Sequence, residues 1–285
     1  MTATVARHSF PTEHAAEGLA VLTRSAGRLI GGLEDPPSDL GDALRLTLTL
    51  AKSHCLLDPE SGELSTWEAW VTAMQTGSAL FAAATSGEAS VTCRIADKDR
   101  TLPTAGTHRY ADAGAWLTAF YLAAVCREKE RLTALCRIPL SLLHAADNQY
   151  DEYVYAWVDT LQTYWLGGSG LGRKLVAAVD GTDPSVIPTA DHELTGKIIY
   201  PPMELFHRII RGDNDGFNRA LLEALQWHKE YWSDEDRALQ STGLVALAPL
   251  AMACFAHDAD FPIEVRSEYL PKYLLERAWA GEFPT

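Results

Sequence analysis

Glu204 and His207, three residues apart, are the pair in this sequence whose types and spacing most suggest metal chemistry. On a helix, di-iron carboxylate proteins use this Glu-x-x-His spacing, but their sites need a second such motif and two further glutamates. The sequence contains no second copy. If the flanking segments form a helical hairpin, His228 lies roughly 13 Å from His207 along the helix axis. We therefore expect no metal and no cofactor.

The other motifs that could support catalysis are incomplete. The glycine-rich stretch 167–172 lacks the Gly-Lys-Ser/Thr ending of a phosphate-binding loop. Residues 213–216 resemble the start of a calcium loop, but Phe217 stands where an oxygen ligand is needed. There is no G-x-S-x-G elbow and no H-E-x-x-H pair. We therefore expect a protein that is not an enzyme.

Two alternatives stay open. One is an all-α enzyme or small-molecule-binding protein with a pocket between helices. That pocket would lie where these side chains converge: Glu204, His207, His228 and Tyr231. The other is a structural or oligomerisation scaffold, which would present a large apolar surface patch. The sequence itself fixes no oligomeric state.

A binding function is indicated instead by an acidic helix face. In the segment 150–166, helical spacing predicts that Tyr150, Val154, Trp157, Leu161 and Trp165 face the core. The opposite face then carries Asp151, Glu152, Tyr155 and Asp159. An exposed tyrosine among carboxylates could anchor a basic partner, because tyrosine offers contact area at little entropic cost and acids steer association. A solvated helix face without a partner would give the same pattern.

A second acidic cluster follows near the end of another expected helix. It consists of Asp234, Glu235 and Asp236. Acidic residues in the first turn of a helix are also favoured by the helix dipole, so the cluster has a structural explanation as well. We include these residues as the second choice for a partner-binding surface.

The charge of the whole chain narrows the class of partner. The 285 residues carry a formal net charge of −14, with 24 Lys and Arg against 38 Asp and Glu. A nucleic-acid binder needs a basic stripe, so we expect no nucleic-acid partner. Residues 91–142 form a net basic segment within this acidic chain, because they contain eight basic and five acidic residues.

Helical periodicity positions these residues almost throughout the chain. Helices are predicted over these ranges: 15–33, 40–56, 65–85, 111–127, 150–166, 171–179, 191–199, 203–211, 215–232, 247–256 and 271–279. Ser65 and Glu68 match a capping box at the start of the third. Alternating residues in 90–103 predict one short β-hairpin with a turn at 97–99. We expect an all-α fold, with residues 1–285 forming a single domain of packed antiparallel helices.

The sequence also indicates a compartment. The longest apolar run, 244–256, is shorter than the roughly 20 residues of a transmembrane helix and contains Pro249, so we expect no membrane span. The N-terminal segment lacks the apolar core of a secretory signal. Five widely spaced cysteines without a C-x-x-C pair favour reduced thiols. Together these features predict a cytoplasmic protein.

Several longer landmarks carry a resemblance to a known family. They are Cys55-Leu-Leu-Asp-Pro59, Trp67-Glu-Ala-Trp70, Trp227-His-Lys-Glu-Tyr-Trp232, Gly243-Leu-Val-Ala-Leu-Ala-Pro-Leu250, Ala253, Asp258, Asp260-Phe-Pro-Ile-Glu264 and Ser267-Glu-Tyr-Leu-Pro271. With them the chain resembles the immunity 49 family of bacterial polymorphic-toxin systems. The resemblance implies an all-α immunity protein that protects the producing cell by binding a cognate toxin domain. It supplies no set of toxin-contacting residues.

Overall fold

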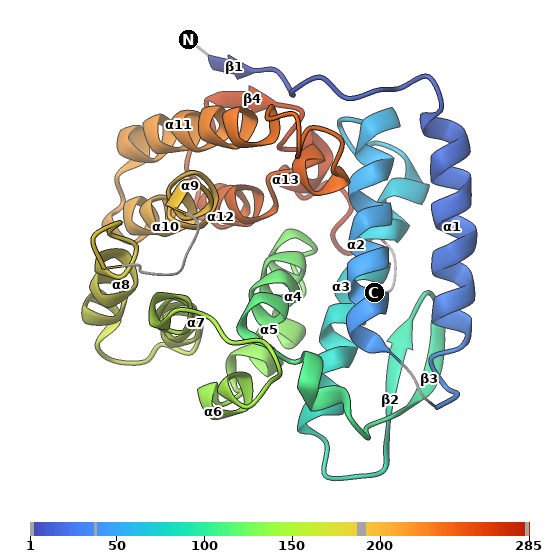
Figure 1. The fold of residues 1–285 in the computed structure, drawn as a ribbon. Helices are drawn as coiled ribbons and strands as arrows, with labels where there is room; N and C mark the ends of the chain where they lie inside the picture. Colours follow the sequence, from blue (N-terminus) through green and yellow to red (C-terminus); the bar gives the residue numbers. More distant parts are fainter. Residues whose placement is uncertain (1–2, 37–38, 187–191, 283–284) are drawn as a thin grey trace.

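The computed structural model describes residues 3–36, 39–186, 192–282 and 285, and within them it is predominantly helical. The first half contains α1 (Ala15–Gly31), α2 (Leu40–Leu57), α3 (Leu64–Thr85), a 3-10 turn η1 (Thr107–Tyr110), α4 (Ala113–Val125), α5 (Lys129–Cys136) and α6 (Leu140–His144). Figure 1 shows α1, α2 and α3 packed side by side along one edge of the molecule. The all-α fold class is confirmed.

The second half forms the other side of the molecule. It contains α7 (Glu152–Trp165), α8 (Leu171–Asp180), α9 (His192–Leu194), a π-helical turn η2 (Thr195–Ile199), α10 (Pro201–Arg211), α11 (Asn214–Trp232), a 3-10 turn η3 (Ser241–Leu244), α12 (Leu247–Asp258) and α13 (Lys272–Leu275). Helix α4 joins the halves, since it packs against both α3 and α12 (Figure 1).

The helix expected over 191–199 is a short α-helix, α9, followed by the π-helical turn η2. Residue 191 lies outside the described residues.

Two small sheets accompany the helices. The expected hairpin is confirmed as β2 (Ser90–Ile95) paired antiparallel with β3 (Lys98–Pro103). Its turn is one residue earlier than predicted, because Ala96 and Asp97 both adopt positive φ and form a two-residue loop. The sequence reasoning missed the second sheet, in which β1 (Ala3–Val5) pairs parallel with β4 (Val265–Ser267). This pairing places the N-terminal strand β1 against β4, a strand from the last part of the sequence (Figure 1).

Three tryptophans fix the centre of the core. Trp70, Trp116 and Trp157 are fully buried, and two of them have hydrogen-bond partners for their indole N–H groups. Trp116 donates to the Leu135 carbonyl at 2.9 Å, and Trp157 donates to the Tyr121 hydroxyl at 2.8 Å. Buried tryptophans need such acceptors because an unsatisfied N–H is costly. These bonds tie α4 to α5 and to α7.

Some local predictions are wrong. The capping box at Ser65 does not form, because α3 begins at Leu64 with Glu63 at the cap position. The helix expected over 271–279 ends at Leu275 and continues as turns. The apolar segment Ser241–Asp258 reaches the length and composition of a membrane span, contrary to the expectation of too short a run, yet 61% of it is buried inside the protein. The segment comprises η3 and α12, and its burial makes it part of the protein core.

Candidate functional site

The acidic face of α7 differs from its prediction at its central residue. Tyr155 is only 2% exposed, and its ring stacks on His144 with 3.7 Å between ring centroids. Its hydroxyl accepts a hydrogen bond from the backbone N–H of Tyr150 at 3.3 Å. Helix α6, which the sequence reasoning did not anticipate, supplies His144 and covers this face. The prediction of an exposed tyrosine is therefore wrong.

The carboxylates around Tyr155 do not form one open surface. Asp159 accepts a hydrogen bond from the Lys174 ammonium at 2.8 Å, so it joins α7 to α8. Asp151 occupies the N-cap position of α7 and Glu152 its first turn, where a helix dipole favours negative charge. Glu152 is exposed and Asp151 and Asp159 are partly buried. Their role in partner binding stays a prediction.

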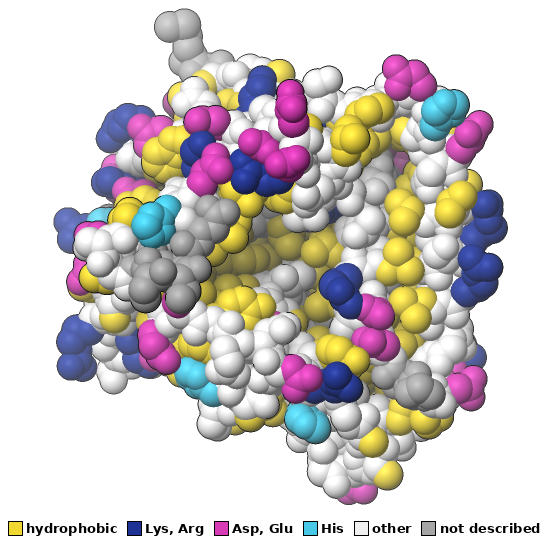
Figure 2. Space-filling model, in the orientation of Figure 1, with side chains coloured by type: hydrophobic (Ala, Val, Ile, Leu, Met, Phe, Trp, Pro, Cys, Tyr) yellow, Lys and Arg dark blue, Asp and Glu magenta, His cyan; other side chains and the backbone are white. Residues whose placement is uncertain are grey.

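The second acidic cluster follows α11, and all three of its side chains are exposed. Asp234 lies 3.5 Å from the Arg237 guanidinium, which also pairs with Glu193 at 2.9 Å. Figure 2 shows acidic and basic side chains intermingled over this end of α11. The charge of Asp234 is thus partly neutralised by Arg237, whereas Glu235 and Asp236 lie exposed outside the Arg237 ion pairs. Whether they bind a partner also stays a prediction.

The residues proposed for a pocket between helices lie in different surroundings. Glu204 bonds to Arg208 with a nitrogen–oxygen distance of 2.6 Å, and His207 stays 43% exposed beside it. His228 is buried on α11, and its Nε2–H donates to the Gly243 carbonyl at 2.9 Å. Tyr231 lies under the Arg237 guanidinium at 3.9 Å. In the part of the chain that the structure describes, no three His, Cys, Asp or Glu side chains are grouped to hold a metal.

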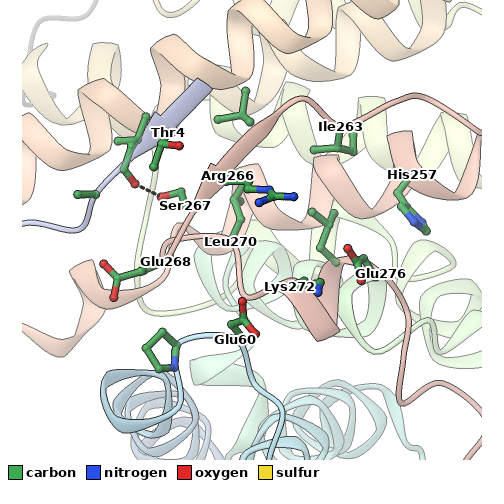
Figure 3. Close-up of a pocket in the computed structure, with 15 residues that line it drawn as sticks. Thr4, Glu60, His257, Ile263, Arg266, Ser267, Glu268, Leu270, Lys272 and Glu276 are labelled. Atoms are coloured by element: carbon green, nitrogen blue, oxygen red, sulfur yellow. Dashed lines mark hydrogen bonds between the residues drawn. The ribbon is translucent and has the colours of Figure 1, made fainter. Parts of the chain in front are cut away.

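A pocket of about 750 Å³ lies instead beside the paired strands β1 and β4, and we call it the terminal pocket. Its lining comes from β1, β4, the end of α12, the start of α13 and the loop after α2 (Figure 3). The lining residues are Thr4, Val5, Ala6, Pro59, Glu60, His257, Ile263, Val265, Arg266, Ser267, Glu268, Leu270, Lys272, Leu275 and Glu276. This volume is in the range of pockets that hold small ligands or an anchoring side chain of a partner.

The terminal pocket has an apolar floor and a charged rim. Val5, Val265, Leu270 and Leu275 form the buried floor. Arg266 and Lys272 stand on the rim, and neither forms an ion pair with another described residue. Figure 3 shows both side chains directed toward the open space, with the carboxylates of Glu60 and Glu276 nearby. An apolar centre surrounded by charges is the arrangement found at protein–protein contacts.

Hydrogen bonds between distant segments hold the pocket wall in place. The backbone N–H of Ala3 donates to the Glu264 carbonyl at 2.9 Å, and the Ser267 hydroxyl donates to the Val5 carbonyl at 2.7 Å. Arg7 donates to the Glu268 carbonyl at 3.0 Å. These contacts fix the N-terminal strand as one side of the pocket, so its shape depends on residues that are more than 260 positions apart.

A buried polar cluster lies behind this wall. The Tyr269 hydroxyl accepts from the backbone N–H of His8 at 2.8 Å, and its ring packs edge-on to His228 at 4.7 Å. Burial lowers the pKa of His228 to about 3, so the ring is neutral at pH 7. Lys52 donates to the Thr242 carbonyl at 2.9 Å, and burial lowers its pKa to about 8. The cluster links α2, α11 and both chain ends.

The sequence did not indicate the terminal pocket, although several residues that carry the family resemblance line it. The landmark residues Pro59, Ile263, Ser267, Glu268 and Leu270 line it, and Trp232 packs against Gly243. Ile263 and Val265 alternate with charged residues, which is a strand pattern that could have indicated β4. No local pattern indicates that this strand pairs with residues 3–5.

Comparison with known proteins gives one match. No curated protein matches the chain. No solved structure matches it either. A family model described as immunity protein 49 matches residues 58–274, a range that includes α3 to α12, β4 and most of the terminal pocket. The match extends over most of the 285 residues. The chain belongs to the immunity protein 49 family.

Proposed function

We propose that this protein is a cytoplasmic, non-catalytic immunity protein that neutralises a cognate bacterial toxin by stoichiometric binding. The family match over residues 58–274 is the observation that carries the proposal. The incomplete catalytic motifs and five free cysteines agree with a reduced, non-catalytic protein. The partner is a toxin domain encoded beside this chain's gene.

The terminal pocket is the contact site that we assign to this function. Its apolar floor suits an aliphatic or aromatic anchor of the toxin, and its rim offers both signs of charge for pairing at the edge. Central anchors in pockets provide most of the binding energy at protein interfaces, with rim contacts excluding water around them. We therefore place the toxin's anchoring side chain over Val265 and Leu270.

Titration of the toxin's activity tests the function. Increasing amounts of the protein are added to a fixed amount of the toxin encoded by the neighbouring gene, and the remaining activity is measured. Stoichiometric binding predicts a linear loss that ends at a fixed molar ratio, a complex on size-exclusion chromatography and a toxin of unchanged intact mass. Loss of activity at substoichiometric amounts, with a changed toxin mass, would indicate an enzyme instead.

A variant that fills the terminal pocket tests whether the toxin binds there. Ala6 is exposed and lines the pocket, so Ala6→Trp places an indole over the opening without entering the core. We expect toxin affinity to fall by about tenfold or more, as for loss of an anchor contact. Ala16→Trp, at an exposed position on α1, is the matched control and should bind normally. Equal affinities would remove the terminal pocket from the interface.

A further inference from the structure

A second hollow lies between the hairpin and two helices, and we call it the hairpin groove. It has a volume of about 320 Å³. Helix α3 forms one wall, strand β2 the second and helix α5 the third. Its lining includes Phe81, Cys93, Arg94, Arg131, Leu135 and Ile138. The groove is therefore built almost entirely from the net basic segment 91–142 and α3.

Two arginines in the groove have unused hydrogen-bonding capacity. The Nε atom of Arg94 is buried without an acceptor, and among the described residues the Arg94 guanidinium pairs with the exposed Asp97 alone, at 3.3 Å. The Arg131 side chain forms no hydrogen bond or ion pair with another residue that the structure describes. A buried donor without an acceptor is unfavourable, so the groove lacks an acceptor that would satisfy it.

Three other basic residues of segment 91–142 are already paired with carboxylates. Arg127 is bound to Asp258, and Arg100 and Lys98 both lie near Glu34. The basic side chains that line the groove itself are Arg94 and Arg131. Between them the floor is apolar, because Phe81, Leu135 and Ile138 are buried there.

We propose that the hairpin groove binds an Asp or Glu side chain presented on an apolar segment of the toxin. Guanidinium groups bind carboxylates through paired, charge-assisted hydrogen bonds, and the buried floor would contact the aliphatic neighbours. The groove is open and small, which suits one side chain of a protein better than a free ligand held on all sides. The identity of the partner rests on the proposed function, whereas the carboxylate site does not.

Cys93 provides a probe of the site that needs no toxin. It lines the groove and is partly exposed, whereas the other four cysteines are buried. Its thiolate displaces iodide from either iodoacetate or iodoacetamide, and only the first reagent carries a carboxylate. We measure the two alkylation rates at Cys93 by mass spectrometry and take their ratio. Any change in the thiol pKa affects both rates equally and cancels.

The expected ratio of iodoacetate to iodoacetamide is about tenfold higher in the unaltered protein than in Arg94→Gln/Arg131→Gln, because the variant lacks the charged donors. Arg131→Gln alone, which removes no side-chain hydrogen bond or ion pair with a described residue, should lower the ratio without affecting the fold. The same ratio in all three proteins would overturn the carboxylate site.

Toxin binding then tests the occupant. Arg94→Glu/Arg131→Glu is compared with Arg24→Glu/Arg28→Glu, which makes the same charge change at exposed positions on α1. We expect the groove variant to bind the toxin at least about tenfold more weakly than the control. Equal affinities would overturn the inference and leave the proposed function standing. If the unaltered protein binds no toxin, the proposed function fails, and the alkylation ratio still decides the carboxylate site.

Discussion

The imidazole of His228 donates its Nε2–H to the carbonyl oxygen of Gly243 at 2.9 Å, and this bond ties α11 to η3 behind the terminal pocket. Because a carbonyl can only accept, the buried ring holds its proton on Nε2 when neutral.

Acid should destabilise the protein through His228. Burial lowers its pKa from 6.5 to about 3 in the folded protein, so protonation favours the unfolded chain. The neutral ring contributes fully to the free energy of unfolding above pH 6.5. This contribution is lost as the pH falls toward 3, by about 1.4 kcal/mol per pH unit at most. Urea unfolding at several pH values measures this slope. His228→Gln, which does not titrate, should show a shallower slope, and equal slopes would contradict the prediction.

Gly243→Ala should destabilise the protein through Trp232. A Cβ atom at residue 243 would lie 2.6 Å from the buried indole of Trp232, well inside van der Waals contact. Overpacking of this kind costs about 1–3 kcal/mol of unfolding free energy. Gly27→Ala is the control, because a Cβ at this position of α1 meets nothing within 4 Å. It should be neutral or stabilising in thermal unfolding.

Arg127→Met should loosen the C-terminal segment. The Arg127 guanidinium donates to the Leu274 carbonyl at 2.8 Å and the Leu275 carbonyl at 2.7 Å, and it pairs with Asp258 at 3.2 Å. Removing it leaves the carbonyl acceptors without their donor, which costs about 1–3 kcal/mol for each buried unsatisfied group. Hydrogen exchange should become faster at the amides of α13. Unchanged protection there would show that Arg127 does not hold the segment.

The acidic face of α7 makes a separate kinetic prediction. If it steers a basic toxin, Asp151→Lys/Glu152→Lys should slow association and reduce its dependence on salt. Asp159 is left unchanged because it holds Lys174. Glu13→Lys/Glu17→Lys makes the same charge change at exposed positions near the start of α1 and serves as the control. Stopped-flow association rates equal to the control would exclude this face while leaving neutralisation intact.

Local patterns were sufficient for the long helices and the hairpin. Helix α2 was predicted over 40–56 and extends over Leu40–Leu57, because an amphipathic pattern of that length has few other solutions. Helices α5 and α6, with eight and five residues, are too short to show a period. The error at Tyr155 follows directly, since the face that appeared open is the one that α6 covers.

The terminal pocket could not be predicted for a different reason. Strands β1 and β4 have three residues each, and what defines them is their mutual pairing and not their composition. The residues that carry the family resemblance were recognisable in the sequence, but the cavity that they line exists only when β1 closes it. Arg94 and Arg131 also lay in a segment recognised as basic, whereas the groove between them required the packing of α5 on α3.

The pairing of β1 with β4 also sets an order of events in the cell. Synthesis proceeds from the N-terminus, so residues 3–5 emerge before residues 265–267 and have no strand partner until those residues follow. Closing a loop of that length is among the slower steps of folding. If the terminal pocket engages the toxin as proposed, protection begins only after residues 265–267 have been synthesised and have paired with residues 3–5.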